Sequence, residues 1–393
     1  MWMSTKKGGR RRLDGRPSWV FALLLSVAVA LPSMSCSRVA TARSGFAPLA
    51  ADPTGPAASA APSPVAAPAA ESPTPAPTAI PTAMPEPTPT PEPALDLNRV
   101  RPNELGDIPI LVYHIIGDEE GRWSRTPAGF RQDLQRLYDA GYRPIGLADL
   151  LDDQIDIPAG TSPVVITFDD SSPGQFRFVE KDGERVVDPD CAVGVMEVFH
   201  AAHPDFPLKA TFFVLPAADP PHNLFGQDEY QQEKLRYLVE RGFEIGNHTY
   251  WHQRLDEVND QEVLRQLAMP SKVVQEAVPG YRLRFLALPL GMWPKNRSLA
   301  IGGSFEGIDY RHDAVLMAAS APAPSPNSKE YDSHALERVQ VFENSLQEWL
   351  DRLAAYPPKR YVSDGDPNTI TFPRDLESLL NPASLGNRTA RAY

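Results

Sequence analysis

The stretch Pro163-Val-Val-Ile-Thr-Phe-Asp-Asp170 decides the fold. Its β-branched and aromatic residues predict a strand that is buried on both faces, with two aspartates where the strand ends. Such strands are typical of parallel sheets covered by helices, in which reactive side chains gather at the carboxyl ends of the strands. The rest of the chain is therefore expected to alternate strands with helices.

The sequence on both sides of this stretch shows that alternation. Thr126-Pro127 is a typical helix start, with a capping side chain before a proline in the first turn. Asp190 and Asn344 are expected to cap two later helices. Alternating elements predict an α/β fold with a parallel sheet, open or closed into a barrel. Further strands are predicted at 108–116, 210–215, 243–245, 285–288, 313–317 and 338–341, and further helices at 228–241, 260–277 and 345–354.

Proline divides the chain into two parts. The 393 residues include 42 prolines, about twice the usual ~5% share, and fifteen of them lie between Pro48 and Pro93 among Ala, Thr and Ser. This stretch has no apolar periodicity, so a disordered, polyproline-rich linker is predicted over residues 37–98. A stalk and a ligand for a proline-binding module both fit this composition, and the mixed Ala/Thr background favours the stalk. One large folded domain is expected over residues 99–393.

The first 36 residues are typical of an export signal. Six basic side chains precede an apolar run of about 13 residues, which is too short for a comfortable membrane span, and small residues follow. Ser33-Met-Ser-Cys36 resembles a bacterial lipoprotein cleavage site with Cys36 as the lipidated residue, and ordinary cleavage near residues 40–42 is the alternative. The protein is therefore expected at the cell envelope, as a membrane-anchored lipoprotein or in secreted form.

Net charge and cysteine content indicate which binding partners and disulfides this chain can have. The net charge is −12, and without the first 36 residues 32 basic side chains face 49 acidic ones, a net charge of −17. Such an acidic chain is not expected to bind nucleic acid. The chain has two cysteines, so lipidation of Cys36 would leave Cys191 without a disulfide partner.

Two motifs carry candidate metal ligands. Asp169 and Asp170 follow a strand, where adjacent side chains point to opposite faces and can serve a metal and a substrate separately. His248-Thr-Tyr-Trp-His252 follows the strand 243–245, and imidazoles four residues apart on one face of a helical turn can bind one metal ion. Thr249 stands where a zinc-peptidase helix carries a glutamate, so the base must come from elsewhere, with Asp169 as the candidate.

Two further strand ends carry candidate polar groups. Tyr113-His114 lies near the end of the strand 108–116, where His114 is either a hydrogen-bonded core residue or a catalytic group. Ala287-Leu-Pro-Leu-Gly291 follows another strand, and its Pro and Gly predict a tight turn. Such a turn can present a backbone N–H to an oxyanion, or it can be a turn without a chemical role.

In this order, Ile-Thr-Phe-Asp169-Asp170, Gly246-Asn-His248-Thr-Tyr-Trp-His252 and Leu-Pro-Leu-Gly291 resemble the polysaccharide deacetylases, carbohydrate esterase family 4 with its NodB-homology domain. The opening Ile110-Leu-Val-Tyr-His114-Ile-Ile resembles the branch that deacetylates poly-N-acetylglucosamine in biofilms. The resemblance covers roughly residues 105–375. It implies a distorted (β/α) barrel of about seven strands.

The resemblance also implies a role for each matching residue. Asp170, His248 and His252 would bind one divalent metal ion, and mixed Asp/His ligation suits Zn²⁺, with Co²⁺ or Ni²⁺ as alternatives, better than Mg²⁺ or Ca²⁺. Asp169 would be the general base that activates metal-bound water, and His114 the general acid. The backbone N–H of Leu290 would face the oxyanion, with Pro289 and Tyr113 beside the substrate.

Three departures from the family pattern concern the substrate. Ser171-Ser172 follow the two aspartates where a glycine is common, and an insertion extends to about Asp205, either as a lid or as a surface for a partner. Ala287 stands where the family commonly has an arginine that orients the base. Leu290 replaces a usual aromatic residue.

We therefore expect an exported, monomeric, metal-dependent hydrolase that removes N-acetyl groups from a polysaccharide such as poly-N-acetylglucosamine, peptidoglycan or a chitin-like polymer. The first alternative is an esterase that removes O-acetyl groups from xylan or peptidoglycan. The second is a stalked wall-binding protein with an inactive site.

Overall fold

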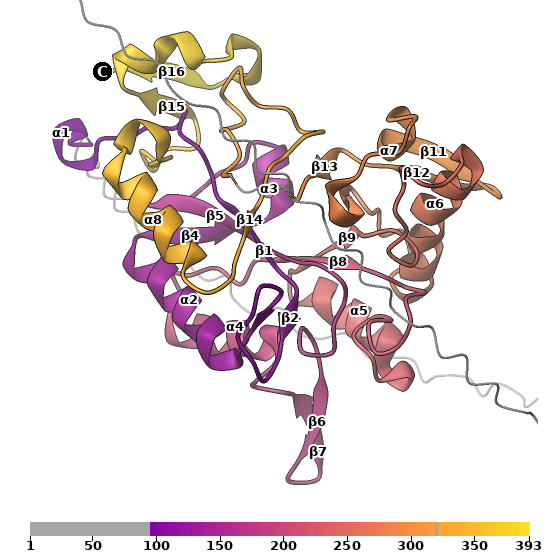
Figure 1. The fold of residues 1–393 in the computed structure, drawn as a ribbon. Helices are drawn as coiled ribbons and strands as arrows, with labels where there is room; N and C mark the ends of the chain where they lie inside the picture. Colours follow the sequence, from indigo (N-terminus) through magenta and orange to yellow (C-terminus); the bar gives the residue numbers. More distant parts are fainter. Residues whose placement is uncertain (1–94, 319–320) are drawn as a thin grey trace, which may run out of the picture. The chain divides into compact units, whose positions relative to one another are not determined.

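The computed structural model describes residues 95–318 and 321–393 (Figure 1). The predicted export signal at 1–36 and the linker as far as residue 94 lie outside the described residues. The centre of the fold is a parallel sheet in which β4 (Tyr142–Ile145) lies beside a path of seven strands. In order, these are β13 (Ala314–Leu316), β10 (Phe285–Ala287), β9 (Glu244–Asn247), β8 (Thr211–Val214), β5 (Ser162–Phe168), β1 (Ile110–Tyr113) and β14 (Val339–Gln340).

The sheet curls until one chain segment touches both of its edges. Leu336 forms a parallel bridge with Leu316 of β13, and three residues later Val339 pairs with Leu111 of β1. The first half of β5 pairs with β4 and its end pairs with β8, which explains the eighth strand. The sheet is a distorted barrel with seven strands on its main path, which confirms the expected fold class.

Alternation along the strands sorts the core into two layers. Val165 and Phe213 belong to a layer inside the curled sheet, whereas Ile166, Phe168 and Phe212 belong to a layer shared with the surrounding helices. Because both faces of β5 are covered, all seven of its residues are buried. The helices of the outer layer are α2 (Pro127–Asp139), α4 (Ala192–Ala202), α5 (Gln231–Glu240), α6 (Asp260–Ala277) and α8 (Ser345–Ala355) (Figure 1).

Local sequence signals place the helix starts well. The Thr126 hydroxyl accepts the Gly129 N–H at 2.9 Å, which confirms the predicted cap of α2. The cap of α4 lies one residue later than predicted. The Cys191 sulfur accepts the Gly194 N–H, whereas the Asp190 carboxylate forms an ion pair with Arg131.

Smaller elements decorate the barrel. The inserted segment 171–205 contains a hairpin that projects from the body of the domain (Figure 1), but it also contains α4, which packs against α2. None of the helices in the described part of the chain has the length and apolar character needed to cross a membrane. The small elements are α1 (Leu97–Val100), α3 (Leu147–Leu151), α7 (Ser298–Ile301), and the strand pairs β2 (Ile115–Ile116) with β3 (Ser124–Arg125), β6 (Phe178–Lys181) with β7 (Glu184–Val187), β11 (Gly302–Phe305) with β12 (Ile308–Arg311), and β15 (Thr369–Phe372) with β16 (Thr389–Ala392).

Candidate active site

A cavity of about 370 Å³ opens where several parallel strands end. This is the edge of the sheet at which the sequence predicted the chemistry. The cavity collects residues from the segments that follow β1, β5, β8, β9 and β10. Of the residues predicted from the sequence, those that line it are His114, Asp169, Asp170, His248, His252 and Leu290.

Three of these side chains offer donor atoms to one point. One oxygen of Asp170 lies 3.3 Å from Nε2 of His248 and 3.5 Å from Nε2 of His252, and the three donor atoms lie within 4.8 Å of one another. The other ring nitrogen of His248 lies 2.9 Å from the Ala287 carbonyl, so the Nδ1–H tautomer directs the Nε2 lone pair at this point. Two imidazoles and a carboxylate are a donor set that suits a zinc-like divalent ion and leaves coordination positions open.

The backbone that carries the two histidines is a loop and not a helical turn. The prediction of a helical turn was wrong, because Thr249 and His252 have φ angles of 71° and 64°. Side chains accept the backbone N–H groups of this loop: Asn247 accepts from Thr249, and Gln266 of α6 accepts from Tyr250 and Trp251. The two imidazoles converge through this tight loop.

The charges of Asp170, His248 and His252 shift one another's pKa values. Burial would raise the pKa of Asp170, but His248 and the other imidazoles hold it well below its usual range. Burial would also lower the pKa of His248, but Asp169 and Asp170 raise it above its usual value. The pKa of His252 falls because of burial and the nearby His248. Asp170 is therefore ionised at neutral pH, as a metal ligand must be.

The second aspartate is held by an arginine that the sequence analysis did not identify. Arg338 donates two hydrogen bonds of 2.8 Å to the two oxygens of Asp169, and both side chains are almost completely buried. Arg338 is itself fixed by the Met317 carbonyl at 2.9 Å. Burial would raise the pKa of Asp169, but Arg338 and then His248 hold it below its usual range. The position of Arg338 at the start of the predicted strand 338–341 was the available signal, because arginine is rarely buried without a partner.

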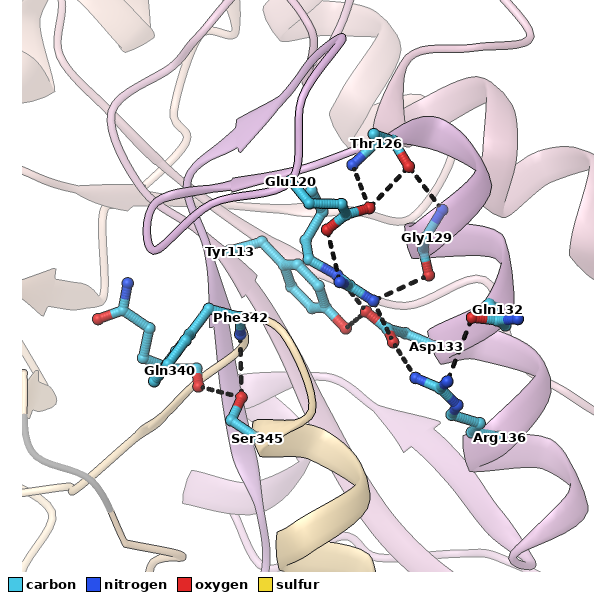
Figure 2. A network of polar contacts seen from close by, with 11 residues as sticks. Tyr113, Glu120, Thr126, Gly129, Gln132, Asp133, Arg136, Gln340, Phe342 and Ser345 are labelled. Atoms are coloured by element: carbon cyan, nitrogen blue, oxygen red, sulfur yellow. Dashed lines mark hydrogen bonds and ion pairs between the residues drawn. The ribbon is translucent and has the colours of Figure 1, made fainter.

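Strand alternation separates the two residues that were predicted together at the end of β1. His114 is half-buried and lines the cavity, and burial lowers its pKa even though Asp169 and Asp170 oppose the shift. The side chain of Tyr113 turns to the outer layer, where its hydroxyl lies 3.4 Å from Asp133 of α2 (Figure 2). It does not line the cavity.

The serines after the two aspartates have structural roles. The Ser171 hydroxyl accepts the Leu215 N–H at 2.9 Å, and Ser172 donates to the His114 carbonyl at 3.1 Å. Asp170 and Ser171 both have positive φ angles, 76° and 51°. The two hydroxyls tie this bend to the ends of β1 and β8, where glycine would supply conformational freedom without contacts.

The predicted turn after β10 is present as a short 3₁₀ segment, Pro289–Gly291. Pro289 is buried beneath the cavity wall, whereas Leu290 has a φ of 56° and a side chain that is 58% exposed on the cavity. Gly291 has a φ of 69°, and an added Cβ would lie 3.1 Å from the Ala318 backbone nitrogen. Glycine is therefore required at this bend.

Comparison with known proteins points to one family. The family model for polysaccharide deacetylase matches residues 156–301, which include both aspartates, both histidines and the turn at 289–291, but neither His114 nor Arg338. A chitooligosaccharide deacetylase of Bradyrhizobium is 26% identical over 138 residues, 35% of this chain and 50% of that protein. One from Sinorhizobium fredii is 31% identical over 126 residues, 28% of this chain and 54% of that protein. The matched part of the chain thus spans about half the length of these relatives.

Solved structures of similar fold include a Streptococcus pyogenes deacetylase, PplD, in complex with acetate, at 18% identity and a TM-score of 0.46, with 62% of this chain and 97% of that chain covered. They also include IcaB from Ammonifex degensii, at 17% identity and a TM-score of 0.44, with 63% and 96% covered.

Proposed function

We propose that this chain, which carries a polysaccharide deacetylase domain, is a metal-dependent hydrolase that removes N-acetyl groups from an envelope or extracellular polysaccharide. The observation that supports this proposal best is the convergence of Asp170, His248 and His252 beside the arginine-held Asp169. A donor triad next to a buried, ionised carboxylate is the arrangement that metal-assisted hydrolysis of an amide needs.

The metal would be a single divalent ion held by Asp170, His248 and His252. The mixed donor set favours Zn²⁺, with Co²⁺ or Ni²⁺ as alternatives. When bound, such an ion supplies Lewis-acid polarisation of the acetyl carbonyl and makes water more acidic. The proton transfers of the reaction are assigned to side chains of this protein.

Asp169 acts as the general base in this proposal. Its carboxylate is ionised because Arg338 stabilises the charge, and one oxygen lies 3.9 Å from Nε2 of His248, so it borders the space next to the donor triad. Arg338 fixes both oxygens, so the carboxylate is oriented before the substrate enters. Asp169 can therefore accept the proton of the attacking water at a defined position.

His114 acts as the general acid. Its burial lowers its pKa, so the protonated ring is a stronger acid than a free imidazolium and can give its proton to the leaving sugar amine. The backbone N–H of Leu290, presented by the turn that Pro289 begins, is assigned to the oxyanion of the acetyl group. Tyr113 packs in the outer layer against Phe130 and Phe168 and does not line the cavity, so no contact with the substrate is assigned to it.

The N-terminal part completes the proposal. An export signal over residues 1–36, with Cys36 as a lipid attachment site, and a proline-rich stalk would hold the domain away from the membrane. A monomeric enzyme on such a stalk suits an insoluble or surface-bound polymer. The acidic surface argues against nucleic acid as a partner.

The decisive experiment measures acetate release by the purified protein, with each candidate metal, from N-acetylglucosamine oligomers and from acetylxylan. Release from the oligomers that stops with a chelator and returns with Zn²⁺, Co²⁺ or Ni²⁺ is expected. Preferential release from acetylxylan would favour an O-acetyl esterase. Absence of release from both substrates by metal-loaded protein would favour the inactive wall-binding protein.

The ligand assignment has its own readout. Asp170→Asn and His248→Ala should each lower the metal content of the purified protein, measured by elemental analysis. Glu180→Gln on the projecting hairpin is the matched control and should retain the metal. Normal metal occupancy in a ligand variant would remove that residue from the set.

A further inference from the structure

Exposed apolar side chains gather at the candidate site. Within residues 95–318 and 321–393, five large apolar side chains are exposed, and three of them, Ile115, Trp123 and Leu290, line the cavity. The other two, Val198 and Tyr356, do not line it. Exposed apolar groups concentrated at one concave site mark a surface that binds something with an apolar face.

Trp123 is the largest member of this group. Its side chain is 46% exposed, and its ring centroid lies 4.8 Å from that of His114, with the rings inclined at 68°. The guanidinium of Arg122 lies 5.1 Å from the same ring. The indole therefore stands directly beside the proposed acid and remains open to a ligand.

The backbone around Trp123 is fixed on two sides. The Ile115 N–H donates to the Trp123 carbonyl at 2.9 Å, which joins β2 to β3. The Gln340 side chain donates to the Arg122 carbonyl at 2.7 Å, which ties the same loop to β14. The indole thus needs little rearrangement before it can contact a ligand.

A buried ion-pair network holds the end of this loop. Arg125, two residues after Trp123, binds both oxygens of Asp133 at 2.8 and 2.9 Å and Glu120 at 2.6 Å. Glu120 in turn accepts the Thr126 hydroxyl at 2.7 Å, so the loop is closed onto the start of α2. Figure 2 shows Asp133 beside the Tyr113 hydroxyl, with Glu120, Thr126 and Gly129 gathered around the same network.

We propose that Trp123 and Ile115 form a platform for the sugar ring next to the acetylated unit, so that the enzyme prefers chains over single sugars. This inference rests on the proposed deacetylase function. The cavity volume of about 370 Å³ falls in the range of pockets that hold whole small molecules, far more than an acetyl group needs. A pyranose ring carries axial C–H bonds on its faces, and an exposed indole beside the reacting group offers the matching apolar surface.

The test compares long and short substrates within each variant of the full chain. The readout is the ratio of kcat/KM for the N-acetylglucosamine hexamer to that for the single sugar N-acetylglucosamine, which has no neighbouring ring. General damage to His114 lowers both terms and cancels. Trp123→Ala is expected to lower this ratio about tenfold, a usual effect of removing an aromatic binding residue. Trp123→Phe keeps an aromatic platform, so its ratio should stay within about twofold of the wild-type ratio. Val198→Ala changes an exposed apolar side chain that does not line the cavity, and its ratio should match that of the wild type.

Each outcome decides the proposal. A folded Trp123→Ala protein with an unchanged ratio, or a wild-type ratio near one, would overturn it. Absence of acetate release from every oligomer by metal-loaded wild type would instead overturn the proposed function. In that case calorimetric binding of the hexamer decides the platform: weaker binding by Trp123→Ala supports it, and equal binding overturns it.

Discussion

Two buried arginine–aspartate pairs in this domain have nearly the same geometry and different surroundings. Arg338 binds both oxygens of Asp169 at 2.8 Å at the cavity, and Arg125 binds both oxygens of Asp133 at 2.8 and 2.9 Å between the loop of β3 and α2. Asp133 is completely buried and Asp169 is 2% exposed. Arg338 and Asp169 are 169 positions apart, whereas Arg125 and Asp133 are only eight apart, at the end of β3 and in α2.

The pKa shifts of the two aspartates nevertheless differ in direction. For Asp133, burial raises the pKa and outweighs the opposing effect of Arg125 and Arg136. For Asp169, burial acts in the same direction, but Arg338 is joined by His248 and His114, and the pKa falls below its usual range. Both buried carboxylates face arginine, so the imidazoles of His248 and His114 are the additional charged neighbours that accompany the lowered pKa of Asp169.

The largest expected effect comes from replacing Asp169, the carboxylate of the pair at the cavity. Asp169→Asn keeps the shape of the side chain but cannot accept a proton, so acetate release should fall at least about 10³-fold, or roughly 4 kcal/mol in barrier height. Metal content should remain at the wild-type level, measured by elemental analysis on the same sample. Activity within tenfold of wild type, in metal-loaded protein, would exclude Asp169 as the base.

The next largest effect is expected from replacing Arg338, the arginine of the same pair. Arg338→Met leaves Asp169 buried without its guanidinium, so the pKa of Asp169 should rise and kcat should fall about 10²-fold. Because the base works only when deprotonated, the acid limb of the pH–rate profile should move to higher pH. Arg338→Lys, which restores the charge without the bidentate geometry, should recover part of the loss. An unmoved acid limb in a folded Arg338→Met protein would contradict the positioning role.

Breaking the Arg125–Asp133 pair should lower the stability of the fold more than it lowers activity. Asp133→Asn replaces the buried carboxylate partner of Arg125 with a neutral amide and leaves Glu120 as its remaining carboxylate partner, and we expect the free energy of unfolding to fall by about 2 kcal/mol. Urea denaturation followed by circular dichroism measures this change. The loss of activity at a temperature where the variant is folded should be far smaller than for Asp169→Asn. Equal losses of activity in the two variants would mean that the two pairs have the same role.

Comparison of the two pairs also shows what the sequence could predict. Asp169, Asp170, His248 and His252 were found because each lies in a short motif at a predicted strand end. Arg338 pairs with an aspartate 169 positions away, and no local pattern encodes that contact. The strand order that brings them together follows from closure of the sheet through Leu336 and Val339.

Other differences have local physical causes. The predicted helical turn at 248–252 is absent because Thr249 and His252 have positive φ angles, and Gln266, from the following helix, fixes the loop by accepting the N–H groups of Tyr250 and Trp251. Trp123 was not selected from the sequence, because exposure of an aromatic residue depends on tertiary packing. The sequence thus predicted the strands, most helix starts and the residues that converge as candidate metal ligands, while the groups that position them required the fold.

A third buried polar group sharpens the comparison, because it has no charged partner in its hydrogen bonds. His312 is completely buried, with Nδ1 2.7 Å from the Ala300 carbonyl and Nε2 3.1 Å from the amide nitrogen of Asn247, the residue before His248. Burial lowers the pKa of His312 to about 4, whereas the unfolded chain has a value near 6.5. A proton on Nε2 would face the Asn247 amide donor, so the ring stays neutral in the fold.

The sign of the resulting pH dependence follows from proton binding. Between pH 6.5 and 4 the unfolded state binds a proton at His312 and the folded state does not, so stability is lost as the pH falls through this range, by at most about 1.4 kcal/mol per pH unit. Urea denaturation at pH 7, 5.5 and 4.5 should show wild type losing stability faster than His312→Gln, which does not titrate. Parallel pH curves for the two proteins would show that His312 binds protons equally in both states. Any loss of protein stability in acid would then have to come from the charged pairs. Because the pKa of Asp169 is lowered in the fold, its stabilising contribution is lost only when the pH falls below the normal aspartate range.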